Sequence, residues 1–489
     1  MRLRVSALPV LGVLGLLVVS GCSDSAAPTR PGVLTAALRE PATLLPADVH
    51  DQAGRLVTGA LWTPLADYDA TTGKLTPRAA ESITSTDQVH WTVKLRAGGK
   101  FHDGTPVTSQ SYLDTWNAVT REHWTASDLL RNTLGVKEIA APGPATVTLT
   151  LEHPSGQALA MLASPSLVPL PASVLASHDW AGFAKSPVGN GPFKLDGPWQ
   201  PGGGGKLIRV ADAPGKAREI DLKVGDPAAQ YDEVKAGKLD LATEVPGDRH
   251  DAMHTEFADR HVTWPLPDVT YLAFPLQDKR FQDSTVRHGF ALGVDRAALE
   301  AGPLAHQIDP ARALLPPADA PGERSGTCRP CSFDGPAAKA LLTQATFSGA
   351  TTVYFGPEAE TWAKPLAEQL HTALGVDVTA KPRQGTAPTD GPYTLTVPLA
   401  SPSPHELLAA LAKATGYTAD GFTQLLDSAD TAANADASGR LYRLAENQLL
   451  RDLPVAPLWS GHGHAVWTDR AHNVTATPFG DVNLAEITI

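Results

Sequence analysis

The chain has 489 residues, with 40 Lys or Arg and 52 Asp or Glu, which gives a formal net charge of −12. This acidic balance argues against a nucleic-acid-binding surface, which needs clustered Lys and Arg, and three cysteines are too few for a disulfide scaffold. A hydrophobic fraction of 42% predicts a folded chain rather than low-complexity disorder, although Gly and Pro are abundant, and the length suits two or three domains.

The N-terminal segment has the pattern of an export signal. Arg2 and Arg4 precede the apolar run Val5–Val19, which is too short to span a membrane comfortably and fits the apolar core of a secretory signal. The run ends in Val19-Ser20-Gly21-Cys22, which resembles a bacterial lipobox: an aliphatic residue, two small residues and then Cys. An ordinary signal peptide with an incidental cysteine is the alternative.

The lipobox resemblance implies where the mature protein begins and where it resides. Residues 1–21 would be removed as a lipoprotein signal peptide, and Cys22 would carry the lipid. Residues 22–32 are small, polar and Pro-bearing, which favours a flexible tether. We therefore expect an extracytoplasmic protein that is anchored to the outer face of the cell membrane by lipid on Cys22.

Strand-like and helix-like periodicities alternate along the rest of the chain. Strands are expected at Val33–Arg39, Val89–Leu95, Val147–Leu151, Leu207–Val210, Leu239–Thr243, Thr351–Phe355, Val376–Ala380 and Val455–Trp459, and as two pieces within Val262–Leu276 that Pro265 and Pro267 separate. Helices are expected at Gln52–Leu65, Thr108–Arg121, Ala228–Ala236, Val286–Leu299, Glu358–Leu374 and Leu441–Leu450. This alternation predicts an α/β protein.

The remaining cysteines form the sequence Cys328-Arg-Pro-Cys331. Outside the cytoplasm this spacing favours a local structural disulfide or idle thiols over redox chemistry. A four-thiolate zinc site is not expected, because the chain has no second cysteine pair.

Several sequence blocks resemble one protein family. They are Leu75–Ser82, Lys100–Pro106 (Lys-Phe-His-Asp-Gly-Thr-Pro), Ser186–Phe193, Ala236–Leu241, Val286–Arg296 and Asp452–Leu458. In this order they are similar to the extracytoplasmic solute-binding proteins of ABC importers, family 5, which is the dipeptide, oligopeptide and nickel-binding class. Each block also has a plain structural explanation, such as turn chemistry in Asp103-Gly-Thr-Pro106.

The resemblance implies a two-lobed periplasmic-binding-protein-like fold with mixed sheets and two hinge crossovers. Lobe one is expected at 33–261, with an extra subdomain inserted at about 76–180, and lobe two at 274–456. The hinge segments would be 262–273 and the start of 457–489, and the rest of that last segment would return to lobe one as a C-terminal tail. Ligand would lie between the lobes.

The chain departs from the family where peptides are usually held. Peptide-binding members carry a segment like Gly-Trp-x-x-Asp-Tyr-x-Asp-Pro, whose Asp pairs with the peptide α-ammonium. The corresponding stretch, Tyr393–His405, has neither that Trp nor that acid. A buried ammonium without a counter-charge keeps its desolvation cost, so we expect no binding by the usual N-terminal clamp. Asp390 or another acid could substitute.

Candidate ligand contacts follow from the resemblance and from residue chemistry. We expect contributions from Trp62, Asn190, Tyr271, Phe274, His405, Trp459 and His462. The pair His462-Gly-His464 would place both rings on one face of a strand, either as a metal-binding pair or as cleft-lining side chains. We expect no bound metal and no cofactor.

The function predicted from the sequence is binding rather than catalysis. The chain lacks Gly-x-Ser-x-Gly, His-Glu-x-x-His and phosphate-loop motifs, so we expect no enzyme. We expect a monomeric, lipid-anchored solute-binding protein that captures a small organic solute, peptide-like or other, and delivers it to an ABC permease. The alternative is a transporter-like lipoprotein that acts as a regulator or scaffold in cell-envelope biogenesis.

Overall fold

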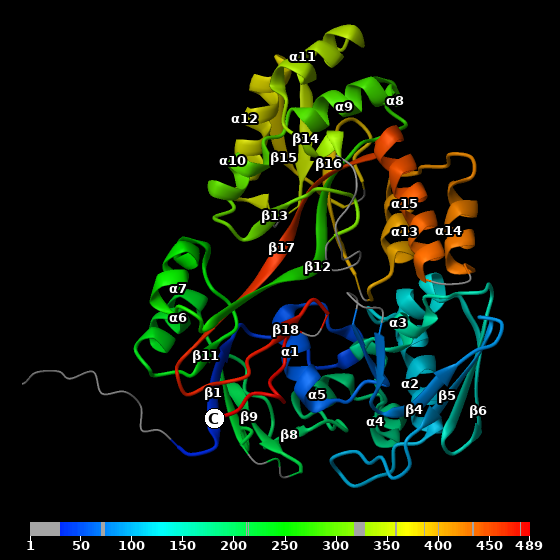
Figure 1. Ribbon diagram of the computed structural model, residues 1–489, viewed down its shortest axis with the longest axis vertical. Helices are drawn as coiled ribbons and strands as arrows, with labels where there is room; N and C mark the ends of the chain where they lie inside the picture. The colour runs from blue at the N-terminus through cyan, green and yellow to red at the C-terminus, as the bar shows by residue number, and fades with distance from the viewer. Residues whose placement is uncertain are drawn as a thin grey trace, which may run out of the picture.

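The computed structural model describes residues 30–69, 74–211, 213, 215–316, 328–356, 359–385, 387–399, 401–432, 435–479 and 481–489. These residues form a mixed α/β fold with a lower and an upper lobe in Figure 1. Two long strands, β12 (His261–Ala273) and β17 (Val455–Trp467), run between the lobes as an antiparallel pair. The α/β class and the two crossovers agree with the sequence prediction, whereas the domain boundaries stay predictions.

The lower lobe contains most of the first half of the chain and the C-terminal tail (Figure 1). Its strands are β1 (Val33–Leu38), β2 (Ala66–Asp69), β3 (Lys74–Pro77), β4 (Ala80–Thr84), β5 (His90–Leu95), β6 (Val136–Gly143), β7 (Thr146–Leu151), β8 (Phe193–Leu195), β9 (Gly204–Arg209), β10 (Glu219–Val224), β11 (Leu241–Ala242), β18 (Ala476–Thr477) and β19 (Asp481–Val482). Its α-helices are α1 (Gln52–Leu61), α2 (Ser109–Glu122), α3 (Ala158–Leu162), α4 (Ala172–Ser177), α5 (Trp180–Lys185), α6 (Pro227–Lys235) and α7 (His250–Glu256).

The upper lobe is built from the segment between the two crossing strands. Its strands are β13 (Ile308–Pro310), β14 (Thr351–Phe355), β15 (Val378–Pro382) and β16 (Tyr393–Pro398). Its α-helices are α8 (Lys279–Gln282), α9 (Ser284–Leu292), α10 (Arg296–Ala301), α11 (Gly335–Gln344), α12 (Ala363–Leu374), α13 (Pro404–Thr415), α14 (Phe422–Asp430) and α15 (Ala435–Asp452).

One continuous sheet passes through both lobes. Its strand order is β15-β14-β16-β12-β17-β11-β1-β10-β9-β8, and β13 pairs separately with β17. The upper-lobe strands therefore extend from β12 and the lower-lobe strands extend from β17. Because these two strands carry the chain between the lobes, a change in lobe orientation must act on them.

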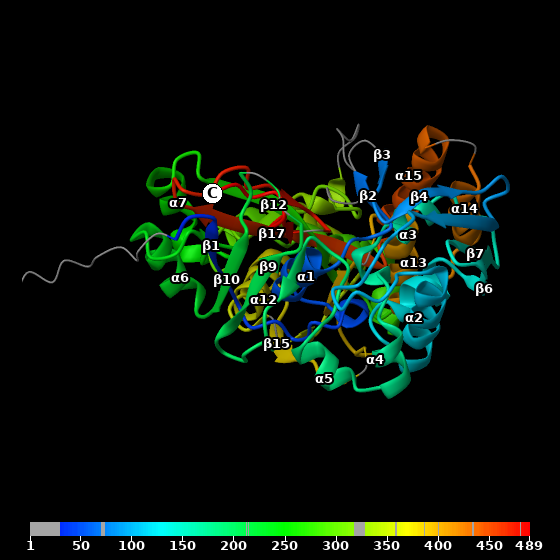
Figure 2. The ribbon, with the colours of Figure 1, turned by 90° about the horizontal axis from the view of Figure 1, so that it is seen from below.

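A second, four-stranded antiparallel sheet, β4-β5-β7-β6, lies at one end of the lower lobe, away from β1 and α6 (Figure 2). The buried Tyr112 and Trp116 belong to α2, which packs on this sheet. The Lys100–Pro106 block forms the turn before α2, where Asp103 Oδ1 accepts a hydrogen bond from the Thr105 N–H at 2.9 Å. This confirms the structural explanation of that block.

In the upper lobe, hydrophobic clusters pack against both faces of the crossing strands. At the end of β12, Leu272 and Phe274, the residue directly after the strand, belong to one hydrophobic cluster, whereas Tyr271 and Ala273 belong to the cluster on the opposite face. The alternation of side chains along a strand explains this division.

Among the described residues, no helix combines the length and apolarity that a membrane span would need.

Three predicted elements on or next to the crossing strands need correction. The two strand pieces within Val262–Leu276 are one strand, β12, whose register shifts between Pro265 and Val269. The helix predicted at Val286–Leu299 is two helices, because Asp295 caps a new helix, α10, through a hydrogen bond from the Ala298 N–H at 3.0 Å. The short strand predicted at Val455–Trp459 continues to Trp467.

Candidate functional site

The register shift in β12 creates a distinctive place between the lobes. Pro265 pairs with His462 and Val269 with Ser460, so Leu266–Asp268 lie opposite a single residue of β17. Proline cannot donate a backbone hydrogen bond, and prolines in sheets are therefore found at bulges. The shift thus removes part of β12 from regular pairing just where the strand carries an acidic residue.

Asp268 is the acidic residue at this bulge. Its side chain is half-buried, and its carboxylate interacts with its own backbone N–H. No other described residue gives it a hydrogen bond or an ion pair within 4 Å. Burial raises the pKa of the Asp268 carboxyl, and the charge of Arg55 opposes this rise. A partly desolvated carboxylate without an ion-paired side chain is suited to receive a cationic group of a ligand.

Arg55 links this region to the C-terminal tail. It belongs to α1, and its Nε lies 2.7 Å from Oδ2 of Asp481, a residue that is 1% exposed. Burial raises the pKa of the Asp481 carboxyl, and Arg55 again opposes the rise. Asp268 and Asp481 thus share one arginine, so the region has an excess of acidic groups.

The stretch that lacks the acid of peptide-binding relatives, Tyr393–His405, passes beside this bulge. Pro398, the last residue of β16, pairs with Asp268, and the Leu399 N–H donates to Pro267 O at 2.8 Å. The nearby Glu406 carboxylate accepts a hydrogen bond from Ser401 Oγ at 2.9 Å. Asp390, considered above as a substitute, accepts one from the Tyr354 hydroxyl at 3.1 Å.

The four aromatic residues predicted to contact ligand lie in the hydrophobic cores. Trp62 is 3% exposed and donates its indole N–H to Pro169 O at 3.1 Å. Tyr271 is fully buried and donates its hydroxyl to Leu314 O at 2.6 Å. These contacts occupy the polar atoms of both rings, so burial favours a core role over ligand contact.

Phe274 and Trp459 are packed in the same way. Phe274 is fully buried and packs against the phenylalanines at 281 and 290, with ring centroids 5.9 and 6.2 Å away. Trp459 is 4% exposed and meets Trp362 edge to face at 4.8 Å. Neither ring presents a surface that a ligand reaches in this conformation.

The three polar candidates have structural partners as well. Asn190 Oδ1 accepts a hydrogen bond from the Thr63 N–H at 3.1 Å, which ties its loop to the end of α1. His405 Nδ1 lies 2.8 Å from Asp430 Oδ2, and His462 Nε2 lies 2.5 Å from Asp309 Oδ2. The seven predicted residues therefore come from both lobes and have structural contacts in this conformation, and their contact with a ligand stays a prediction.

The remaining predicted sites are the cysteines and the histidine pair. Cys328 and Cys331 form a disulfide, whereas Cys22 lies outside the described residues. The rings of His462 and His464 share one face of β17, with centroids 5.6 Å apart. In the part of the chain that the structure describes, no group of three or more His, Cys, Asp or Glu is arranged to hold a metal ion.

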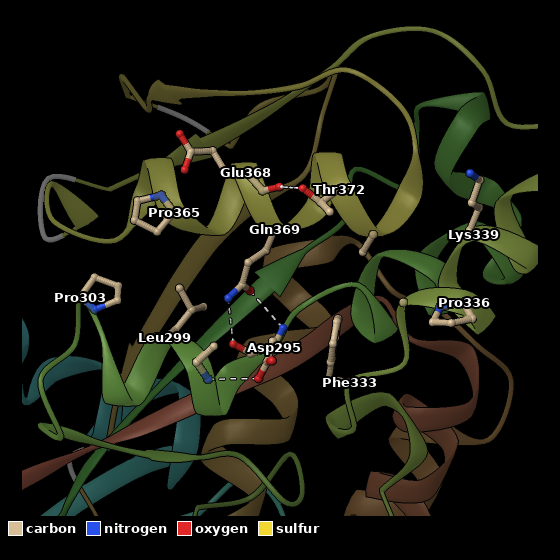
Figure 3. A pocket seen from close by; sticks show the side chains of 13 residues that line it. Asp295, Leu299, Pro303, Phe333, Pro336, Lys339, Pro365, Glu368, Gln369 and Thr372 are labelled. Atoms are coloured by element: carbon tan, nitrogen blue, oxygen red, sulfur yellow. Dashed lines mark hydrogen bonds between the residues drawn. The ribbon is translucent and has the colours of Figure 1, made fainter.

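A pocket of about 680 Å³ lies elsewhere, among α10, α11 and α12 of the upper lobe (Figure 3). The Gln369 side chain in this pocket is engaged, because it accepts from the Asp295 N–H at 3.0 Å and donates to Asp295 O at 3.1 Å. These bonds stabilise the start of α10. The pocket is separate from the bulge of β12 and offers no additional unpaired acid for a cationic group.

The comparison with known proteins decides the family. The model of bacterial extracellular solute-binding proteins, family 5 (middle region), matches residues 74–419. The chain belongs to this family. The members are binding proteins rather than enzymes, so the prediction of a non-enzyme agrees with this result.

A relative and two structures illustrate the similarity. The glutathione-binding protein GsiB of Shigella dysenteriae is 26% identical over 354 residues, which cover 69% of this chain and 65% of GsiB. HbpA2 from Haemophilus parasuis shares the fold with a TM-score of 0.80 at 16% identity, covering 94% of this chain and 99% of HbpA2. DppA from Helicobacter pylori, in complex with the peptide STSA, gives a TM-score of 0.75 at 19% identity, covering 94% and 98% of the two chains.

Sequence reasoning missed Asp268 and its neighbours Arg55 and Asp481. The only local indication was an acid directly after Pro265-Leu-Pro267 in a predicted crossover. Two prolines in a strand predict irregular pairing there. Arg55 and Asp481 are 426 positions apart, and neither has a motif of its own. Only the fold reveals that they are neighbours.

Proposed function

We propose that this protein is the extracytoplasmic receptor of an ABC importer, which holds a small organic solute between its two lobes and delivers it to a permease. The observation that carries the proposal is the match of the family model across residues 74–419. The two strands that join the lobes agree with closure by hinge bending at 262–273 and at the start of 457–489.

The solute class that fits best is a peptide-like molecule with a free ammonium group. One relative is named for glutathione binding, and one structural neighbour is in complex with a peptide. Asp268 is the acid that we assign to the ammonium, because it is partly desolvated, has no hydrogen-bonded or ion-paired partner on another described residue, and pairs in the sheet with Pro398 of the altered stretch. This would replace the usual clamp by a carboxylate from the crossing strand.

The proposal is tested by calorimetric titration with glutathione, dipeptides and tripeptides, each compared with its N-acetylated form. Acetylation should weaken binding, and Asp268→Asn should reduce affinity for the free amines by about 10- to 100-fold, which corresponds to the loss of one charge-assisted hydrogen bond. Asp377→Asn is the matched control, because that side chain is 81% exposed, and this variant should bind normally.

The possible outcomes separate the parts of the proposal. Tight binding that is indifferent to acetylation and to Asp268→Asn would refute the assignment of Asp268 but retain the receptor. An absence of stabilisation by any small solute, together with recovery of envelope enzymes in a pull-down, would favour the regulator or scaffold. A saturating solute should stabilise the protein by about 2.7 kcal/mol at a hundredfold excess over Kd.

Lipid anchoring through Cys22 belongs to the same proposal and rests on the lipobox-like sequence. A Cys22→Ala variant should lose incorporation of labelled fatty acid and leave the membrane fraction, whereas Cys328→Ser should keep both properties. Equal membrane association of wild type and Cys22→Ala would refute the anchor without affecting the proposed solute binding.

A further inference from the structure

Six imidazoles gather where the two crossing strands meet α7 and the turn after α10. We call them the histidine cluster: His250 and His254 of α7, His261 of β12, His306 of the turn, and His462 and His464 of β17. The ring centroid of His250 lies 5.2 Å from that of His254, 5.3 Å from that of His306 and 5.1 Å from that of His464. The cluster thus connects four separate segments around one central ring.

Local structure explains why these rings face one another. On β17, alternation places His462 and His464 on one face, while Gly463 faces the other way. A Cβ built on Gly463 would lie 2.2 Å from the indole ring of Trp264, so only glycine admits this close approach. On α7, His250 and His254 are four residues apart and share one helix face.

The cluster lies across a direct contact between the lobes. A Cβ built on Gly247, in the turn before α7, would lie 2.5 Å from Ala305 Cβ and 3.0 Å from Ala305 O. From the upper-lobe side, Gln307 O accepts a hydrogen bond from the His462 N–H at 3.0 Å. Residues 305–307 are therefore held between α7 and β17, and separation of α7 from the upper lobe must break this packing.

The turn itself is held in an unfavourable conformation. Ala305 and His306 have φ values of +45° and +57°, a region that residues with side chains adopt at a cost. The contacts on both sides keep the turn in place. Loss of these contacts would therefore let the turn relax.

Carboxylates reach only part of the cluster. His306 Nδ1 lies 3.1 Å from Glu300 Oε1 of α10, and His462 contacts Asp309 of β13. For His250, His254, His261 and His464, the described residues supply no carboxylate within 4 Å. Other charged groups here include Asp251, which favours the charged form of His250, and Arg312, which acts on Asp309. Arg249 pairs with Asp232 of α6 at 3.7 Å, and Arg260, next to His261, donates to Trp467 O at 3.0 Å.

Three of the rings without a carboxylate neighbour also have a buried nitrogen that makes no hydrogen bond with a described residue. His250 Nδ1, His261 Nδ1 and His464 Nε2 have no hydrogen-bond partner among the described residues. The remaining polar contact joins His254 Nδ1 and His261 Nε2 at 3.1 Å, which requires one ring to donate and the other to accept. Protonating both of these rings would place two donors in contact and break that bond.

Burial and like charges oppose protonation at the centre. Burial, together with the neighbouring imidazoles, His462 and His250 first, lowers the pKa of His464 to about 3. Burial also lowers the pKa of His250, with His254 and His306 acting in the same direction. Because these folded-state pKa values lie below the ordinary value of about 6.5, the packed cluster is fully stable above that pH and loses stability as the pH falls below it.

We propose that the histidine cluster is an acid-sensitive latch between the lobes: neutral imidazoles hold α7 against residues 305–307, and their protonation releases this contact. The latch acts through the orientation of the lobes and does not depend on which solute the protein binds.

Hydrogen exchange of the full chain, without added solute, tests the latch at pH 7 and pH 5. After correction for chemical exchange rates, opening of residues 247–256 and 461–467 should increase at acidic pH. A histidine with a pKa near 6.5 when released, and held neutral when packed, contributes an increase of about 25-fold between these pH values. An α2 peptide from the lower lobe should not show this increase.

Variants identify the responsible rings. His464→Gln should reduce the acid response by about 25-fold, and His250→Gln, tested separately, should also reduce it, so that a folding failure of one variant leaves the other informative. The matched control, His153→Gln with His472→Gln, changes two exposed histidines and should respond like wild type. An unchanged acid response in both cluster variants, or an equal increase throughout the molecule, would overturn the proposal.

Discussion

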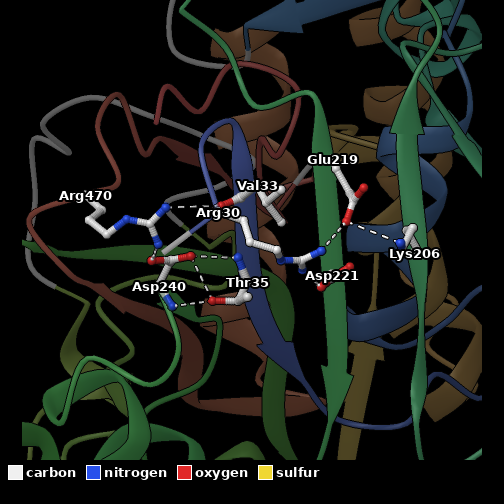
Figure 4. Close-up of polar contacts among 8 residues, drawn as sticks. All are labelled: Arg30, Val33, Thr35, Lys206, Glu219, Asp221, Asp240 and Arg470. Carbon is white, nitrogen blue, oxygen red and sulfur yellow. Dashed lines mark hydrogen bonds and ion pairs between the residues drawn. The ribbon is translucent and has the colours of Figure 1, made fainter. Parts of the chain in front are cut away.

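The buried carboxylate of Asp240 is predicted to fasten the C-terminal tail to the lower lobe. Asp240 is 3% exposed, and its Oδ2 accepts hydrogen bonds from the backbone N–H and the hydroxyl of Thr35 at 2.8 Å each (Figure 4). Its other oxygen pairs with Arg470, whose side chain is 30% exposed and also reaches Val33 O at 3.4 Å. Replacing either partner with alanine should destabilise the lobe, and the two effects should not be additive.

The magnitudes follow from what each change leaves behind. Asp240→Ala removes every bond to the carboxylate and leaves the Thr35 N–H without this acceptor, so we expect a loss of about 4 kcal/mol, within the range of about 3–5 kcal/mol for breaking a buried pair. Arg470→Ala leaves Asp240 with both Thr35 bonds and should cost about 2 kcal/mol. The double variant should cost less than the sum by about 1.5 kcal/mol.

A double-mutant cycle, measured by urea unfolding with tryptophan fluorescence, checks this coupling. Lys364 and Glu368 provide the control cycle, because this pair on α12 is 3.7 Å apart with side chains that are 83% and 66% exposed. We expect a coupling of about 0.5 kcal/mol or less for that exposed pair. A coupling between Asp240 and Arg470 no larger than the control value would refute the reasoning.

Two further predictions concern close packing and the disulfide. Gly189→Ala should prevent stable folding of the lower lobe, because its Cβ would lie 1.9 Å from Leu61 O, whereas Gly59→Ala on α1, which has open space, should raise the melting temperature slightly. Similar melting temperatures of the two variants would contradict this. Replacing Cys328 and Cys331 together by serine should cost at most about 2 kcal/mol, since the bridge closes a very short loop. A loss of unfolding free energy above about 4 kcal/mol would show that the bridge stabilises the fold by more than the closure of a short loop.

Local periodicity was sufficient where an element is amphipathic and bounded by clear signals. The unit β14–α12–β15 follows its predicted order, and Gly375 ends α12 in a left-handed conformation with φ of +69°. The prediction failed at β12, where Pro265 and Pro267 suggested a break. Pairing with β17 and β16 carries the strand through, and the bulge absorbs the missing donors. Pairing between distant segments is information that a local pattern lacks.

The candidate ligand residues were harder to predict for a related reason. A tryptophan such as Trp459 has the same apolar character whether it lines a ligand site or fills a core, and only its neighbours distinguish the two. The face shared by His462 and His464 followed from strand alternation alone. The other members of the histidine cluster come from α7, β12 and a turn, and the sequence gives no reason to group them.

Two arginines explain why the blocks shared with the family indicate the fold but do not identify the solute. Arg287, 6% exposed, donates to Leu453 O at 3.0 Å, and Arg296, 3% exposed, donates to Pro457 O at 2.8 Å. Both therefore join the block Val286–Arg296 to the block Asp452–Leu458, where β17 begins. These buried side chains donate to backbone carbonyls, which gives them a structural role. Since the blocks determine how the crossing strand is seated, we expect solute preference to depend on positions outside them, with Asp268 as the first to test.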